Sequence, residues 1–245
     1  MNIEYHKWYS HSLTQEMAIK VYGHSGKPLL VFPAQAGTFF EFEDFGMIDA
    51  IREFIESGKV QVFTVDSIDA QSWANWIAHP ADRAQRHNDY DRYIVNEVSP
   101  FIFNKNGTGK KLIATGCSMG GCHAGNFFFR HPDIFDTVIA LSGLFQMTLF
   151  VGDYSDENIY LNSPIHYLPN LEDPWYLDKY RESQIIICTG QGAWEEDMMR
   201  DAQQMKSILE NKQIPAWVDF WGYDVNHDWP WWRQQLPYFL GHIEL

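Results

Sequence analysis

Short apolar segments of strand length alternate along this chain with segments whose apolar residues recur at helical spacing. The predicted strands are rich in β-branched and aromatic residues and cover residues 27–32, 60–65, 111–115, 137–141, 184–189 and 216–221. The predicted helices run through residues 47–55, 90–102, 119–130, 198–209 and 231–243. The strands lack strict alternation of apolar and polar residues, as is usual for strands buried on both faces. Buried strands followed by helices predict an α/β fold, with a mainly parallel sheet and helices on both of its faces.

One long segment, residues 144–182, breaks this alternation. It is rich in Asn, Pro, Tyr and Asp, and it is too irregular for a second domain. We therefore expect residues 1–245 to form a single domain, which suits the length of the chain. Residues 144–182 are then an insertion or cap over the carboxyl edge of the sheet, where α/β proteins bind their ligands.

Composition and charge narrow the classes of function. Apolar residues make up 45% of the chain, and the net charge of -14 predicts an acidic surface that repels phosphate backbones and anionic membranes. We therefore expect neither nucleic acid nor a membrane as partner. The first residues lack a basic and apolar leader, and three cysteines suit a reducing compartment, so we expect a cytoplasmic location. The aromatic content of 16% leaves room for a homo-oligomer interface without defining an oligomeric state.

No metal or other cofactor is expected. Cys117 and Cys122 lie five positions apart with no obvious further ligands, which argues against a zinc site. The acidic segments 66–69 and 153–157 lack the spacing of a calcium-binding loop, so we interpret them as solvated loops.

The clearest chemical signal is the sequence Gly-Cys-Ser-Met-Gly at residues 116–120. It has the form G-x-S-x-G, and it lies between a predicted strand and a predicted helix. A sharp turn there lifts the hydroxyl of Ser118 above the sheet, and the helix N-terminus and the amide of Met119 face any oxyanion formed beside it. A tight turn with a purely structural serine is the alternative. The strand–turn–helix context favours a nucleophile.

A serine nucleophile needs a base, and His227 is the candidate. In hydrolases with this turn, the acid and then the base follow the serine along the chain, at the ends of late strands. His227 lies six residues beyond the last predicted strand. The other histidine in this part of the chain, His242, falls inside the last predicted helix. The alternative for His227 is an ordinary histidine of a surface loop.

The acid should follow the strand 184–189, where Glu195, Glu196 and Asp197 stand in a row. Acidic residues at the start of a helix are also favourable because of the helix dipole. The apolar face of the helix 198–209 places Asp197 within that helix. It leaves Glu195 and Glu196 in the loop or the first turn, and these residues alone do not decide between them.

A second oxyanion donor should come from the loop after the strand 27–32. Small residues at 33–37 would let a backbone amide approach a substrate oxygen, and we expect the amide of Gln35 or Ala34 to be this donor. An ordinary turn is the alternative.

Together these residues resemble the putative-esterase group of α/β-hydrolase serine esterases, which includes esterase D, tributyrin, acetyl-xylan and feruloyl esterases. The resemblance covers most of the chain from about residue 15. Its marks are the segments 116–121, 129–135 (Phe-Arg-His-Pro-Asp-Ile-Phe), 140–143 (Ala-Leu-Ser-Gly) and 227–237. The last segment is similar to the family's His-x-Trp-x-x-Trp end, where the histidine is the base. The resemblance implies the α/β-hydrolase fold.

Two departures from the family pattern concern the site. The family has His-Gly after the strand of the oxyanion loop, where this chain has Pro33-Ala34. The acid of the family is an Asp in a Gly-x-Glu-Asp-like turn, which matches Glu195-Glu196 here. The resemblance therefore implies Glu196 as the acid, with Glu195 as second choice and Asp197 as third.

The predicted function is a serine carboxylesterase that cleaves short-chain esters through an acyl-enzyme on Ser118, with a small-molecule ester as substrate. A thioesterase or an acyltransferase would use the same triad, so the sequence does not separate these activities. An inactive hydrolase fold that serves as a binding module is the alternative from another class.

Overall fold

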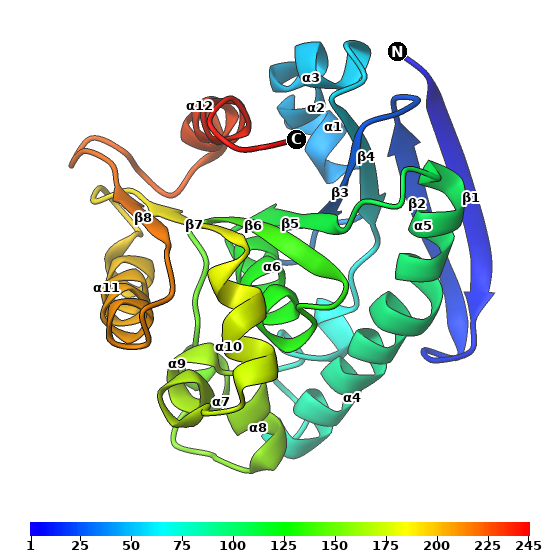
Figure 1. Cartoon of the computed structure of the whole chain (residues 1–245). Helices are drawn as coiled ribbons and strands as arrows, with labels where there is room; N and C mark the ends of the chain where they lie inside the picture. Colours follow the sequence, from blue (N-terminus) through cyan, green and yellow to red (C-terminus); the bar gives the residue numbers. More distant parts are fainter.

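The computed structural model describes residues 1–245, and an eight-stranded sheet runs through it (Figure 1). The strands, in chain order, are β1 (Ile3–Ser10), β2 (Gln15–Tyr22), β3 (Lys27–Phe32), β4 (Val60–Val65), β5 (Leu112–Cys117), β6 (Phe135–Leu141), β7 (Gln184–Thr189) and β8 (Trp217–Phe220). Their order across the sheet is β1-β2-β4-β3-β5-β6-β7-β8. Strands β3 to β8 pair in parallel, whereas β1 and β2 are antiparallel. The predicted α/β class with a mainly parallel sheet is confirmed.

Helices cover both faces of this sheet. One face carries α1 (Glu41–Asp44), α2 (Met47–Ala50), α3 (Arg52–Glu56) and α12 (Trp229–Leu240) (Figure 1). The other carries α4 (Pro80–Tyr93), a π-helical turn (Ile94–Val98), α5 (Ser99–Asn106), α6 (Met119–Arg130) and α11 (Glu196–Asn211). No helix is both long enough and apolar enough to cross a membrane.

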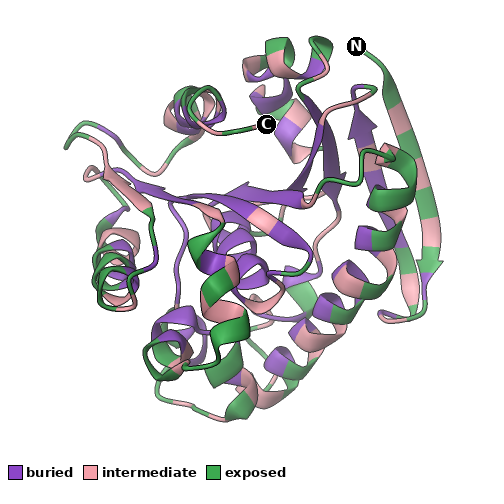
Figure 2. Ribbon diagram, in the orientation of Figure 1, coloured by how far each residue is buried: buried purple, intermediate pink, exposed green.

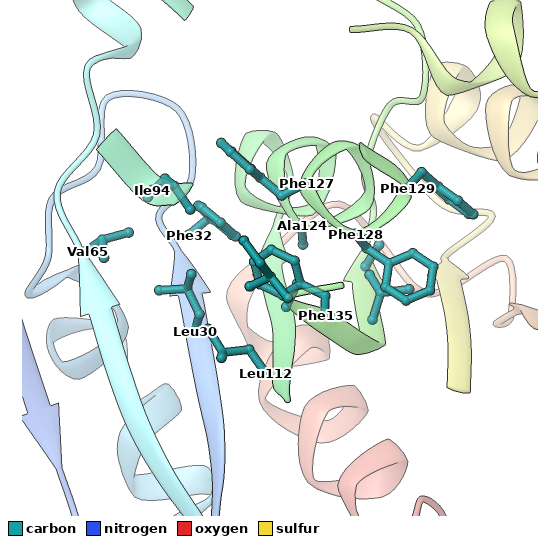
Figure 3. Close-up of a cluster of buried hydrophobic side chains, with 14 of the residues drawn as sticks. Leu30, Phe32, Val65, Ile94, Leu112, Ala124, Phe127, Phe128, Phe129 and Phe135 are labelled. Atoms are coloured by element: carbon teal, nitrogen blue, oxygen red, sulfur yellow. The ribbon is translucent and has the colours of Figure 1, made fainter. Parts of the chain in front are cut away.

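The core lies in two layers, one on each face of the central strands, which are buried along their length (Figure 2). Figure 3 shows part of the larger layer, where α6 packs on β3 and β5. Phe127 of α6 stacks on Phe32 of β3, with ring centroids 4.9 Å apart and an angle of 4° between the planes. This packing fixes α6, and therefore its first residues, against the end of β3.

The N-terminal hairpin β1–β2 is absent from the sequence prediction. Side chains of β1 alternate between exposed and half-buried, because this strand forms the edge of the sheet (Figure 2). The predicted helix at 47–55 is broken at Ile51 into α2 and α3. The helix predicted at 90–102 begins earlier, at Pro80, with His79 as its N-cap.

The predicted insertion, residues 144–182, forms four short helices and a single 3₁₀ turn. These are α7 (Thr148–Val151), α8 (Glu157–Leu161), α9 (Pro164–Tyr167), η3 (Leu168–Asn170) and α10 (Pro174–Arg181). The helices α8 and α9 pack against α4, α6 and α11. From the start of the segment, Leu144, Leu149 and Phe150 line a cavity beside Ser118, which follows β5.

The parallel strands end almost level with one another at that edge. Cys117 of β5 pairs with Leu141 of β6, and Leu141 pairs with Cys188 of β7. On the far side, Thr189 of β7 pairs with Phe220 of β8. The loops that follow β3, β5, β6, β7 and β8 therefore meet at one place, although they are far apart in the sequence.

Candidate active site

Ser118 occupies a sharp turn between β5 and α6. Its φ of 57° and ψ of -120° lie outside the regions that residues with a side chain prefer. The turn is tight because β3, β5 and α6 converge there, so that a Cβ on Gly120 would collide with the carbonyl oxygen of Phe32. Ser118 donates its own amide hydrogen to the carbonyl of Leu141 at 2.9 Å. Neighbouring packing therefore holds the strained backbone that exposes the hydroxyl.

His227 reaches Ser118 from the loop after β8. Its Nε2 lies 2.8 Å from the Oγ of Ser118. The loop is held in place because His227 donates its amide hydrogen to the carbonyl of Ala193 at 3.0 Å, and Asn226 Oδ1 accepts from the amide of Ala193 at 2.8 Å. Trp232 of α12 meets the imidazole edge-to-face, with centroids 4.9 Å apart. The structure thus brings the two predicted residues into hydrogen-bonding distance.

The carboxylate next to His227 belongs to Glu195, whereas the sequence analysis placed Glu196 there. Glu195 Oε1 lies 3.5 Å from His227 Nδ1, and Glu195 is 1% exposed. Glu196 is exposed and is the first residue of α11. Asp197 pairs with Arg200 one turn along the same helix. The difference arises at Trp194, whose left-handed φ of 69° turns the chain so that the residue directly before the helix faces inward.

Three side chains orient the carboxylate of Glu195. Ser142 Oγ donates to Oε1 at 2.5 Å, and Thr189 Oγ1 donates to Oε2 at 2.8 Å. The indole Nε1 of Trp232 donates to Ser142 Oγ at 3.0 Å. Because an indole nitrogen only donates, the Ser142 oxygen accepts this bond and its own hydrogen is free for Glu195. Sequence reasoning gave Ser142, Thr189 and Trp232 no role in orienting the acid, although Ser142 and Trp232 lie in segments that carry the family resemblance.

The loop after β3 places the two predicted oxyanion donors differently. Gln35 lines the same cavity as Ser118, His227 and Met119. Ala34 instead donates its amide hydrogen to Glu41 Oε2 at 2.7 Å, so this amide is already used. Met119 is buried at the first turn of α6, where amides have no partner within the helix. The geometry therefore favours Gln35 over Ala34, and Glu41 is a residue that the sequence analysis missed.

A cysteine, Cys122, lies beside Ser118 in the cavity wall. Burial raises the pKa of its thiol to about 12, so the thiol stays protonated at neutral pH. His123, which follows it on α6, is buried against Asp69, with Nε2 2.9 Å from Oδ1. Neither side chain competes with Ser118 for His227. No group of three or more His, Cys, Asp or Glu residues is placed to hold a metal ion.

The sequence profile of the family described as Putative esterase matches residues 10–243. The chain is a member of this family. It is therefore a carboxylesterase, an enzyme that hydrolyses esters, as the sequence predicts. No curated protein gives a significant match to the chain.

Solved structures of low sequence identity share the fold of this esterase. One is a ferulic acid esterase, with a TM-score of 0.76, 18% identity, and coverage of 99% of this chain and 97% of that chain. A second is an S-formylglutathione hydrolase from Staphylococcus aureus, with a TM-score of 0.68, 17% identity, and coverage of 98% and 96%. A third, from the same organism, is fluorophosphonate-binding serine hydrolase F, with a TM-score of 0.68, 18% identity, and coverage of 98% and 97%. These neighbours confirm the predicted α/β-hydrolase fold.

The cavity beside Ser118 in this esterase is small. Its volume is about 300 Å³, at the lower end of the range for ligand sites. Apolar side chains from three segments form about half of its wall, namely Met119, Cys122, Leu144, Leu149, Phe150, Trp194 and Met198. The first part of the segment 144–182 thus closes one side of the site.

Proposed function

We propose that this esterase cleaves short-chain carboxylic esters through an acyl-enzyme on Ser118. The main support is the 2.8 Å contact between Ser118 Oγ and His227 Nε2 at the mouth of an apolar cavity. In this mechanism the Ser118 oxygen attacks the ester carbonyl carbon while its proton passes to His227 Nε2. The tetrahedral intermediate then collapses, and the alcohol leaves with the proton from His227. Water, activated by the same nitrogen, attacks the acyl-enzyme and releases the acid.

We assign the acid of the triad to Glu195. The support is its burial and its 3.5 Å approach to His227 Nδ1, the nitrogen that does not face Ser118. A carboxylate there favours the tautomer with the proton on Nδ1 and stabilises the imidazolium formed during attack. The distance is longer than an ideal hydrogen bond. Catalytic contacts of free enzymes often shorten only when substrate is bound.

The oxyanion would be held by the backbone amides of Met119 and Gln35. Met119 contributes an amide at the positive end of α6, a helix of 12 residues. Gln35 contributes from the loop after β3, which lines the same cavity. Donors fixed before the reaction stabilise the developing charge without reorganisation, and this is a large part of catalysis in such enzymes.

The volume of the cavity leads to a prediction about acyl chain length. In buffer without an added acceptor, p-nitrophenyl esters of C2 to C4 acids should turn over faster than the C12 ester, because a long chain overfills a site of about 300 Å³. Leu149→Ala should move the optimum toward longer chains. Leu161→Ala is the control, since Leu161 is also an exposed leucine of 144–182 but lies outside this cavity.

Measured kcat/KM values across the series decide this prediction. A faster reaction of the C12 ester in the wild type would contradict the short-chain proposal. Release of p-nitrophenol that requires an added alcohol or thiol acceptor, with the acyl group recovered on that acceptor, would instead favour an acyltransferase.

The hydrogen bonds around Glu195 lead to a second prediction. Ser142→Ala should lower kcat by roughly 10-fold with little change in KM, because the carboxylate loses the donor on the oxygen that faces His227. A 1 Å misplacement of a reacting group can lower the rate by about 10²-fold, and the loss expected for Ser142→Ala is smaller than that. Trp232→Phe, which removes the donor to Ser142 and part of the ring that packs against His227, should have a smaller effect in the same direction.

Trp221→Phe is the matched control, since the Trp221 indole donates to Asp219 at 3.0 Å and not to this network. Steady-state kinetics and thermal unfolding of all three variants separate positioning from stability. Equal losses in Trp221→Phe and Trp232→Phe would show that the Ser142 contact has no special part in orienting Glu195.

A further inference from the structure

The turn after β3 that presents Gln35 to the cavity is conformationally strained. Gly37 donates its amide hydrogen to the carbonyl of Ala34 at 2.9 Å, which closes the turn. Ala36 lies within it at a left-handed φ of 62°, a conformation that residues with a Cβ rarely adopt. A strained turn persists only where surrounding contacts hold it.

Glu41 supplies such a contact from the first position of α1. Its Oε2 accepts the amide hydrogen of Ala34 at 2.7 Å. Its other oxygen lies close to Gly37, where an added Cβ would collide with the carboxylate. One side chain therefore contacts both ends of the turn that contains Gln35.

The short helix that carries Glu41 is itself fixed to the sheet and the core. Phe42 is buried and meets Trp229 of α12 with ring centroids 6.2 Å apart. Glu43 accepts a hydrogen bond from the Tyr22 hydroxyl of β2 at 2.9 Å and pairs with Lys20. Burial raises the pKa of Glu41, whereas the hydrogen bond from the Ala34 amide lowers it and offsets part of this rise. The carboxylate is thus held at the turn by packing as well as by its own hydrogen bond.

We propose that Glu41 is a positioning residue that holds the turn 34–37 so that the Gln35 amide faces the oxyanion. This inference rests on the proposed acyl-enzyme function. Glu41 is not a catalytic residue, because it contacts the turn and does not line the cavity beside Ser118. By accepting the Ala34 amide hydrogen, it leaves the next amide along the chain, that of Gln35, as the donor of this loop.

Four variants test the proposal. Glu41→Ala removes the acceptor, and kcat should fall by about 10- to 100-fold with KM within about threefold, as expected for a misplaced rather than deleted oxyanion donor. Glu41→Gln keeps an acceptor oxygen and should stay within about threefold of wild type. Gly37→Ala displaces the carboxylate from the other side and should resemble Glu41→Ala, since the φ of Gly37 is not left-handed and only space opposes the methyl group. Asp44→Ala removes an exposed carboxylate of the same helix and is the control.

The double variant Gly37→Ala/Glu41→Ala gives the sharpest result. If both changes act through one contact, the double variant should be no slower than Glu41→Ala alone, so that the two effects are far from additive. Additive losses would overturn the proposal. It would also be overturned if Glu41→Ala kept the wild-type kcat, or if Glu41→Gln lost as much as Glu41→Ala, because the negative charge would then matter and not the acceptor.

Hydrogen exchange provides a readout that does not depend on turnover. Amides of the peptide covering residues 33–37 should exchange faster in Glu41→Ala than in wild type, and at the wild-type rate in Glu41→Gln. Equal exchange in all three proteins would overturn the positioning role. An inactive wild type with the expected exchange pattern would instead contradict the proposed esterase mechanism and leave the anchoring of the turn established.

Discussion

Replacing Ser118 by alanine is expected to lower the turnover of p-nitrophenyl butyrate by roughly 10⁴- to 10⁶-fold, as losses of triad nucleophiles do. The acyl-enzyme cannot form without the hydroxyl, which makes one hydrogen bond in the folded protein, to His227. The fold should be unaffected, because the backbone contacts of the turn do not involve the Ser118 side chain. Removal of a strained residue's hydroxyl leaves the same Cβ in the same place.

Initial rates, corrected for uncatalysed hydrolysis, measure this loss, and thermal unfolding checks the fold. A fluorophosphonate probe should label the wild type and leave the Ser118→Ala variant unlabelled. Ser207→Ala is a suitable control, since Ser207 is an exposed serine of α11 that lies outside this cavity. Activity of more than a few per cent in Ser118→Ala would mean that the nucleophile lies elsewhere.

Glu195→Gln is expected to lower kcat by roughly 10²- to 10⁴-fold, because His227 loses both the charge and the tautomer preference that the carboxylate supports. The glutamine has nearly the same shape, so packing is retained. The amide nitrogen of the glutamine cannot accept a hydrogen bond, so Ser142 and Thr189 then compete for the one remaining oxygen.

The neighbouring acids serve as matched controls. Glu196→Gln and Asp197→Asn should stay within about tenfold of wild type, since Glu196 is exposed and Asp197 pairs with Arg200. Values of kcat for the three single variants, measured at one pH with one ester, show which carboxylate is the acid of the triad. A collapse of Glu196→Gln with a near-normal Glu195→Gln would reverse the assignment and restore the choice made from the family pattern.

The central strands could be predicted from the sequence because burial on both faces leaves an unambiguous apolar run. Residues 27–32, 60–65 and 184–189 are examples in which the predicted and observed bounds coincide. The hairpin β1–β2 could not be predicted in this way. In β1 (Ile-Glu-Tyr-His-Lys-Trp-Tyr-Ser), polar and apolar residues follow no regular period, and the partner that makes it a strand is visible only in the folded sheet.

The candidate site shows the same division between local and long-range information. Ser118 is marked by its glycines and His227 by its place after the last strand, and both signals are local. The choice between Glu195 and Glu196 depends on the left-handed φ of Trp194. Trp194 is exposed, and tryptophan is not a residue type that favours this conformation. Glu41 could not be identified from the sequence, because its proposed role depends on a hydrogen bond from the backbone amide of Ala34, seven residues earlier. Sequence patterns describe side chains and do not show which backbone amide a carboxylate binds.

The hydrogen bond from Trp232 to Ser142 has a consequence for how the enzyme matures. It joins residues that are 90 positions apart, and the contact between His227 and Ser118 spans 109 positions. The strands β3 to β6 and the turn at Ser118 can therefore be complete while the protein is still inert. On the proposed mechanism, we expect no ester hydrolysis until α12 has docked on the sheet, because the indole of Trp232 that packs against His227 also donates to the Ser142 hydroxyl that contacts Glu195. A chain that has been synthesised only as far as β6 would therefore hold Ser118 without the histidine that the proposed mechanism requires.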